Sequence, residues 1–208
     1  MIRTEHREDK WEFPFVEYAP EQGGEKLPLM IQLHGAGERG KGEEDLELVD
    51  VNGFSKYLKV NDVKCRFIMP QCPQNSFWAA KVESIISFIK RLIKEYNADE
   101  TKVYLTGLSM GGFGTWYTAM AKPEMFAAIA PCCGGGMPWN ASVLDMPIWA
   151  FHGSEDGTVN PFYSDDMVKA LEDLNADVKY TKLDGVGHDA WDYAYNEELI
   201  NWFLEKKR

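Results

Sequence analysis

The sequence predicts an α/β fold in which about seven mostly parallel strands form one central sheet with helices on both faces. Short apolar runs recur along the chain, and each is followed by a longer amphipathic segment. Several of these runs are apolar throughout, as expected of strands that are buried on both faces. The length of 208 residues, the 45% hydrophobic content and the lack of a Pro- or Ser-rich linker fit a single domain over residues 1–208.

The expected strands are short apolar runs bounded by turn-forming residues. They cover residues 15–18, 27–34, 66–70, 103–107, 126–131, 148–152 and 178–183. The expected helices carry apolar side chains three and four positions apart, and they cover residues 80–96, 115–121, 164–174 and 197–204. Pro123 ends the second helix, because proline removes a helical hydrogen bond and clashes with the preceding turn. No segment is long enough for a separate lid domain.

The charge and the N-terminal sequence exclude several classes of protein. Lys and Arg number 22 against 33 for Asp and Glu, and a net charge of −11 disfavours binding to nucleic acid or to an anionic membrane. The N-terminal segment MIRTEHREDKWEF alternates charges where a signal peptide needs an apolar core, and no apolar stretch is long enough to cross a bilayer. We therefore expect a cytoplasmic protein with no membrane partner.

The four cysteines, at positions 65, 72, 132 and 133, form no CxxC pair and have no histidine at a metal-ligand spacing. We expect buried free thiols and no metal site.

A glycine-rich segment, HGAGERGKG at residues 34–42, matches GxGxxG and all but the last position of a Walker A loop. That last position is Gly42, so the hydroxyl that would bind magnesium is absent. The acidic residues that follow it, Glu43, Glu44, Asp45 and Glu47, would occupy the place of a phosphate. We interpret this acidic run as a solvated face and expect neither a nucleotide nor any other cofactor.

A second segment, GLSMG at residues 107–111, lies between an apolar strand and a helix. This is the context of a nucleophile elbow, whose tight turn needs glycines on both sides of the serine. Ser109 is therefore the expected nucleophile.

A serine nucleophile needs a histidine base and a carboxylate, in the chain order Ser, acid, His. His188 is the only histidine after the last expected strand, and it lies in a polar loop. The expected acid is Asp156, which follows the preceding strand, with Glu155 as the alternative. The oxyanion hole requires two backbone donors, which we assign to Met110 and to Ala36 with Gly37 beside it.

Five segments together resemble a known family: HGAGERG, PQCPQNSFW, GLSMGGFGTW, WAFHGSEDGTV and GVGHDAWDYAY. They look like the small lidless carboxylesterases of the α/β-hydrolase fold, in the branch labelled dienelactone-hydrolase-like, phospholipase/carboxylesterase-like or predicted peptidase. The resemblance implies Ser109, Asp156 and His188 as catalytic residues, no cofactor, and a small-molecule ester as substrate. True dienelactone hydrolases use a cysteine, so dienelactone chemistry is not expected. Related members are similar to acetyl and feruloyl esterases.

The expected substrate-binding residues are loop aromatics and a methionine at the C-terminal edge of the sheet, namely Phe77, Trp78, Met137, Trp139 and Trp191. A peptidase or amidase with the same triad is the first alternative function. A non-catalytic ligand-binding protein with the same fold is the second. We expect a monomer or a homodimer.

Overall fold

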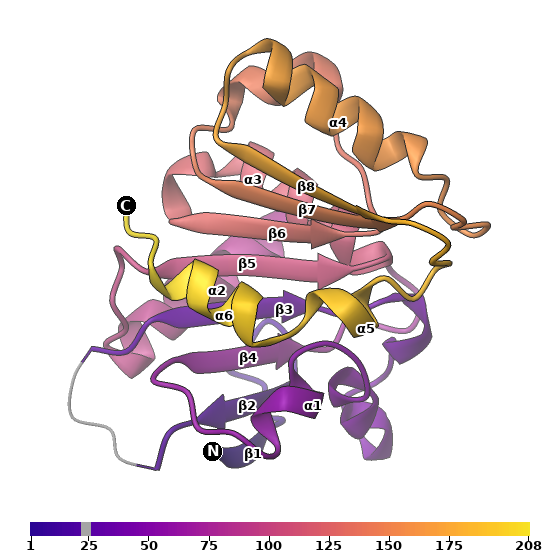
Figure 1. Cartoon of the computed structure of the whole chain (residues 1–208). Helices are drawn as coiled ribbons and strands as arrows, with labels where there is room; N and C mark the ends of the chain where they lie inside the picture. The colour runs from indigo at the N-terminus through magenta and orange to yellow at the C-terminus, as the bar shows by residue number, and fades with distance from the viewer. Residues whose placement is uncertain (22–25) are drawn as a thin grey trace.

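The central sheet contains eight strands in the order β1-β2-β4-β3-β5-β6-β7-β8, in a computed structural model that describes residues 1–21 and 26–208. The strands from β3 to β8 run parallel, so their carboxyl ends meet at one edge of the sheet, on the right in Figure 1. The strands are β1 (Ile2–His6), β2 (Phe15–Ala19), β3 (Leu29–Leu33), β4 (Arg66–Pro70), β5 (Val103–Leu108), β6 (Ala128–Cys132), β7 (Ile148–Gly153) and β8 (Val178–Leu183).

The seven strands expected from the sequence are all present, with ends within two residues of the predicted ones. The additional strand is β1, which pairs antiparallel with β2 at the edge of the sheet. Its sequence is IRTEH, and four of its five residues are exposed. Charged side chains on an edge strand discourage pairing with another chain. Because of the same charges, the strand is not an apolar run and was not predicted.

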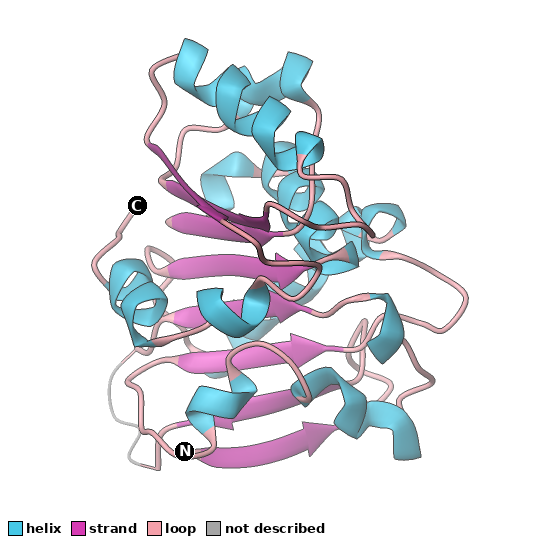
Figure 2. Cartoon of the chain, turned by 45° about the vertical axis from the view of Figure 1, so that its right-hand side comes forward, coloured by secondary structure: helices cyan, strands magenta, loops and turns pink. Residues whose placement is uncertain are grey.

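Helices cover both faces of the sheet, as predicted (Figure 2). In the view of Figure 1, α1, α5 and α6 lie in front of the sheet, and α2 and α3 lie behind it. The helices are α1 (Ser55–Leu58), α2 (Val82–Tyr96), α3 (Met110–Ala121), α4 (Phe162–Asp173), α5 (Trp191–Ala194) and α6 (Glu197–Leu204). Short 3₁₀ helices occupy several loops: η1 (Ala36–Glu38), η2 (Glu44–Asp50), η3 (Trp78–Ala80), η4 (Pro123–Met125) and η5 (Pro138–Val143).

The core forms one apolar layer on each face of the sheet, and alternate residues of a strand enter opposite layers. In β5, Val103 and Leu105 pack in the layer that contains α2 and α3, whereas Tyr104 packs in the layer that contains α6. Both faces of the strand are therefore buried, which explains why the strands appear in the sequence as continuous apolar runs.

Helix α3 begins at Met110, five residues before the expected start at residue 115. Glycine is a poor helix former, so Gly111 and Gly112 suggest a loop at this point. Tertiary packing overrides that preference, because a Cβ atom on Gly111 would lie 1.9 Å from the carbonyl oxygen of Leu33. The first turn of α3 can lie against the end of β3 only with glycine at this position.

Two further expectations are met in the part of the chain that the structure describes. The four cysteines are all free and buried, as predicted. In the acidic run, Glu43, Glu44 and Glu47 are exposed, and Asp45 is half-buried and accepts a hydrogen bond from the backbone N–H of Lys41. Across residues 1–21 and 26–208, we find no helix with the length and apolar character needed to span a membrane.

Candidate active site

Ser109 lies between β5 and α3 in a strained backbone conformation, with φ 54° and ψ −116°. Non-glycine residues rarely adopt positive φ, so the surrounding packing must hold the turn in place. Part of that packing is the close approach of Gly107 to Gly111, where a Cβ atom on Gly107 would lie 2.3 Å from the Gly111 carbonyl oxygen. The strain places the serine hydroxyl beyond the carboxyl end of the central strand, as expected of a nucleophile elbow.

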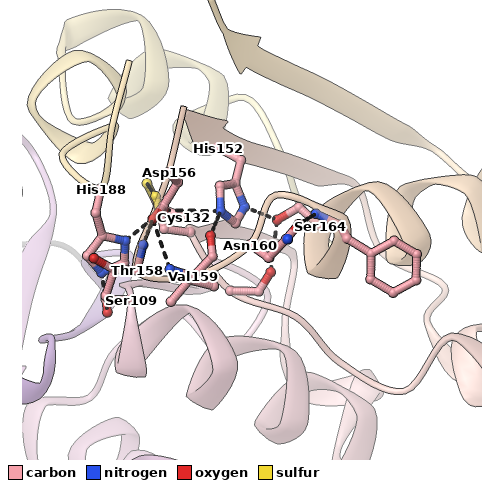
Figure 3. Close-up of polar contacts among 12 residues, drawn as sticks. Ser109, Cys132, His152, Asp156, Thr158, Val159, Asn160, Ser164 and His188 are labelled. Atoms are coloured by element: carbon pink, nitrogen blue, oxygen red, sulfur yellow. Dashed lines mark hydrogen bonds and ion pairs between the residues drawn. The ribbon is translucent and has the colours of Figure 1, made fainter. Parts of the chain in front are cut away.

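Loops that follow β7 and β8 bring the two other predicted side chains to the serine. His188 Nε2 lies 2.8 Å from Ser109 Oγ, and His188 Nδ1 lies 2.6 Å from Asp156 Oδ2 (Figure 3). A carboxylate only accepts hydrogen bonds, so Nδ1 carries the proton and Nε2 is free to accept one from the serine. The three side chains therefore form one hydrogen-bonded chain in which Ser109 donates to His188 and His188 donates to Asp156, as a general base requires.

The environment of Asp156 keeps its carboxylate ionised. Burial by itself would raise the pKa of Asp156, but hydrogen bonds from His188, Val159 and Thr158 outweigh burial and hold the pKa below its usual value. The backbone N–H groups of Thr158 and Val159 both donate to Oδ1 at 2.9 Å, which leaves Oδ2 for His188. Glu155, the alternative acid, is exposed, and within residues 1–21 and 26–208 its carboxylate makes no hydrogen bond or ion pair with His188.

The glycine-rich segment that follows β3 lies beside the elbow. A Cβ atom on Gly35 would lie 3.7 Å from the Cβ atom of Ser109. Ala36 and Gly37 then begin η1, and Met110 begins α3. Backbone N–H groups in the first turn of a helix have no partner within that helix and are available to an anion. Met110, Ala36 and Gly37 therefore remain our predicted donors to an oxyanion.

His34 fixes the start of this loop. The buried ring donates from Nδ1 to the Gly35 carbonyl oxygen at 2.6 Å and accepts at Nε2 from the Cys72 backbone N–H at 2.9 Å. Burial lowers the pKa of His34 to about 4, so the ring is neutral at pH 7. One neutral imidazole thus ties the loop after β3 to the loop after β4.

Trp78 is fully buried, and its indole N–H donates to the His34 carbonyl oxygen at 2.9 Å. The side chain packs against α3, since a Cβ atom on Gly114 would lie 2.5 Å from the Trp78 Cβ atom. The prediction that Trp78 contacts substrate is therefore wrong. Its loop position suggested a pocket residue, but the side chain points into the core and holds the glycine-rich loop through its hydrogen bond to the His34 carbonyl oxygen.

The other predicted substrate-binding residues differ in exposure and position. The Trp191 ring packs edge-on against His188, with 5.1 Å between ring centroids. Phe77 is 55% exposed and Trp139 is 83% exposed, and both are large apolar side chains that water can reach. Met137 is half-buried against the core. The structure thus brings Trp191 into direct contact with the predicted base.

Phe113 and Tyr163 lie close to the serine or to its neighbours and were not predicted as site residues. Phe113 lies in the first turn of α3, and its backbone N–H donates to the Ser109 carbonyl oxygen. Its ring packs edge-on against Tyr163 at 5.6 Å, and Tyr163 is 49% exposed. Phe113 lies four residues after the serine, so predicting the helix to start directly at Met110 would have placed Phe113 next to the site.

Cys133 also lies at the site without having been predicted there. Cys133, Asp156 and His188 each offer one atom that could bind a metal, and these three atoms all lie within 4.8 Å of one another. The three could in principle bind a metal ion, but His188 Nδ1 and Asp156 Oδ2 are 2.6 Å apart. Two ligands of a tetrahedral zinc ion lie about 3.3 Å apart, so the pair fits a shared proton better than a shared metal.

The Cys133 thiol changes the proton affinity of the predicted base. A hydrogen bond from Cys132, with 3.9 Å between the sulfur atoms, lowers the pKa of Cys133, although burial opposes the shift. The contact with Cys133 is the largest cause that raises the pKa of His188, and the carboxylate of Asp156 adds to it against the effect of burial.

We predict that Cys133→Ala shifts the acidic limb of the kcat/KM pH profile to lower pH. A histidine acts as a base only when it is neutral, so a raised pKa makes the enzyme lose activity at a higher pH. Removing the thiol lowers the pKa of His188, and the variant keeps a larger share of its maximal activity near pH 5.5. Cys65→Ala, which removes a buried thiol elsewhere, is the control. An unchanged acidic limb in Cys133→Ala would contradict this coupling.

The fold and the site together define a protein of the α/β-hydrolase fold. Its central parallel strand ends in a serine elbow, and a carboxylate and a histidine follow the last two strands. The family model described as Phospholipase/Carboxylesterase matches residues 19–204, and the chain belongs to this family.

Similar proteins include several esterases. The structure titled as a thermostable esterase is 32% identical, with a TM-score of 0.84 over 100% of this chain and 63% of that chain. The bifunctional acetylxylan esterase/xylanase XynS20E of Neocallimastix patriciarum is 29% identical over 149 residues, which cover 69% of this chain and 21% of that protein. Feruloyl esterase B of Talaromyces funiculosus is 43% identical over 56 residues, 27% of this chain and 15% of that protein. The chain thus spans about a fifth of the length of XynS20E.

Proposed function

We propose that this chain hydrolyses carboxylic esters through a covalent acyl-enzyme on Ser109, with His188 as general base and acid and Asp156 as the orienting carboxylate. The observation that carries the proposal is the chain of hydrogen bonds from Ser109 Oγ through His188 to Asp156, at 2.8 and 2.6 Å. Membership of a family described as Phospholipase/Carboxylesterase supports the same reaction class.

The first half-reaction transfers one proton and one acyl group. His188 Nε2 takes the Ser109 proton while Oγ bonds to the ester carbonyl carbon, and the carbonyl π electrons move onto oxygen. When the tetrahedral intermediate collapses, the bond to the alcohol oxygen breaks and the imidazolium of His188 protonates the leaving alcoholate. Water then repeats the sequence on the acyl-serine, which releases the acid and restores the hydroxyl.

The negative oxygen of the intermediate needs donors that are in place before the reaction. In our proposal these are the backbone N–H groups of Met110 and Ala36, with Gly37 beside them. The N-terminus of α3 adds a partial positive charge at the same point. His34 and Trp78 hold the loop that carries Ala36. This supports the proposal that the Ala36 N–H is already in position before the substrate binds.

The substrate that we propose is a short-acyl or aromatic-acyl ester of the acetyl or feruloyl kind. Three aromatic side chains support this class: Trp191 packs against His188, and Phe113, whose backbone N–H donates to the Ser109 carbonyl oxygen, packs against Tyr163. Flat rings of this kind provide stacking surfaces for an aromatic acyl group. XynS20E and feruloyl esterase B carry acetylxylan esterase and feruloyl esterase in their names, which supports this substrate class.

A panel of substrates tests this proposal. We expect 4-nitrophenyl acetate, acetylated xylan and methyl ferulate to be hydrolysed, and 4-nitrophenyl palmitate and peptide anilides to be turned over at least about tenfold more slowly. An anilide is the harder substrate because its amine leaving group must be protonated before it departs. The measurement is the initial rate at equal substrate concentration.

Ser142→Ala, which changes an exposed serine in η5, should leave all of these rates unchanged. Faster cleavage of the anilides than of the esters would favour the peptidase alternative. Absence of turnover on every substrate, with a well-folded protein, would favour the non-catalytic alternative.

A further inference from the structure

A second histidine contacts the same Asp156 oxygen that accepts a hydrogen bond from His188. His152 is the penultimate residue of β7 and is fully buried, and its Nε2 lies 3.2 Å from Asp156 Oδ2 (Figure 3). The same nitrogen is 2.9 Å from the Val159 carbonyl oxygen. Its Nδ1 is 2.7 Å from the hydroxyl of Ser164 in α4. The reaction proposed above uses neither His152 nor Ser164.

The partners of His152 determine which of its nitrogens carries a proton. Both neighbours of Nε2 are acceptors, a carbonyl oxygen and a carboxylate, so Nε2 must be protonated. Nδ1 is in contact with the hydroxyl of Ser164, which has a single proton to donate. The Gly134 carbonyl oxygen, 2.8 Å from Ser164 Oγ, accepts from the same hydroxyl, so the one proton serves either Nδ1 or this carbonyl at a given moment.

We propose that His152 is a positioning residue for Asp156, packed against Ser164 and directing its Nε2–H toward both Asp156 Oδ2 and the Val159 carbonyl. The proposal rests on the proposed function in one respect, namely that Asp156 orients His188. Ser164 is the second member of this positioning unit.

The contacts around Asp156 explain why positioning is needed there. The carboxylate lies at the start of a turn, and among the described residues its Oδ1 accepts from the N–H groups of Thr158 and Val159, which belong to the same turn. These local contacts move with the turn. His152 belongs to β7, and it ties both the carboxylate and the far end of the turn, at Val159, to the sheet.

The network also joins the acid to the back of the elbow. Ser164 reaches the Gly134 carbonyl, and a Cβ atom on Gly134 would lie 2.4 Å from the Gly112 carbonyl carbon in α3. The side chains of His152 and Ser164 thus connect the acid turn to the segment that supports α3. A displacement of His152 is transmitted to the distance between Asp156 and His188.

Two substitutions at His152 test the proposal. His152→Leu removes the donor, and His152→Gln keeps an N–H that can reach Val159 and Asp156. We expect His152→Leu to lower kcat roughly 10- to 100-fold with KM changed less than about threefold, by analogy with the loss found when the hydrogen-bond partner of a metal-binding side chain is removed. We expect His152→Gln to recover at least about half of the lost factor on a logarithmic scale.

Two readouts do not depend on the choice of ester. The first is the downfield proton NMR resonance of the His188 Nδ1–H, which we expect to weaken or shift in His152→Leu and to return in His152→Gln. The second is the rate at which a fluorophosphonate labels Ser109, which should fall in parallel with kcat. If the wild-type protein hydrolyses no ester, the proposed function fails, and these two readouts still decide the role of His152.

The matched control is Tyr18→Phe. Tyr18 lies in β2, and the substitution removes its buried hydroxyl, which donates to the Asp50 carboxylate at 2.9 Å. It should lower Tm and leave kcat and the resonance unchanged. If His152→Leu behaves in the same way, or if folded His152→Gln is as impaired as His152→Leu, the proposal is overturned.

Should His152→Leu fail to fold, Ser164→Ala decides the question, because it removes only the hydroxyl that contacts His152 Nδ1 and the Gly134 carbonyl oxygen. A several-fold loss of kcat with a shifted resonance supports the proposal. Wild-type kcat and an unmoved resonance overturn it.

Discussion

Ser109→Ala is expected to lower kcat for ester hydrolysis by roughly 10⁶-fold, the loss found when the nucleophile of a serine protease is removed. The variant keeps the Cβ atom and the same positive φ, so the elbow and the start of α3 should be preserved. The measurements are kcat with 4-nitrophenyl acetate, and Tm with circular dichroism to show that the fold is intact. A fluorophosphonate should label the wild-type protein and leave the variant unlabelled.

Contamination and hydrolysis by other surface groups set the lower limit of this measurement, so Ser142→Ala is assayed in parallel and should match the wild type. A Ser109→Ala protein that retains more than a few per cent of the turnover would remove Ser109 as the nucleophile. Labelling of a different residue in that variant would identify the replacement.

The elbow could be predicted from sequence because its causes are local. A continuous apolar run gives a strand buried on both faces, and glycines on both sides of the serine permit the tight turn that follows. The structure places Gly107 and Gly111 in close contact there, where a larger residue would collide with backbone atoms. The chain order of acid and histidine was predictable for a similar reason, since parallel strands bring the following loops to the same edge.

Edge strands and loop side chains were harder to predict because their position depends on what packs beside them. Strand β1 is held by pairing with β2 and has little apolar character of its own. Trp78 follows a polar loop, as a pocket residue would, yet its indole N–H is used by the His34 carbonyl in the core. Neither outcome depends on a sequence pattern near the residue concerned.

The neighbours of the triad depend on contacts between segments distant in the chain. Cys133 was expected to be a buried thiol, which is confirmed, but its proximity to His188 comes from the way β6 and the loop after β8 meet. His152 lies near the end of a strand, just before a glycine, and the sequence does not indicate that its ring faces Asp156. The element that a residue occupies is local information, whereas the partner of its side chain is not.

The Asp156 carboxylate has a hydrogen-bond pattern that an amide cannot reproduce. Oδ1 accepts from the N–H groups of Thr158 and Val159, so an asparagine would place its own oxygen there. Its NH₂ group would then face His188 Nδ1 and the Nε2–H of His152. The NH₂ group and the Nε2–H of His152 would then both be donors, and His188 Nδ1 would have to become an acceptor, which is the opposite tautomer.

Asp156→Asn is therefore expected to lower kcat on the order of 10⁴-fold, the magnitude known for the equivalent change in a serine protease. With Nδ1 accepting from the amide, His188 carries its proton on Nε2 and cannot take the proton of Ser109. The variant should keep its fold, because the two backbone hydrogen bonds to Oδ1 remain. Glu155→Gln, which neutralises the exposed neighbouring carboxylate, is the matched control and should keep the wild-type rate. A large loss in Glu155→Gln with a small one in Asp156→Asn would instead assign the orienting role to Glu155.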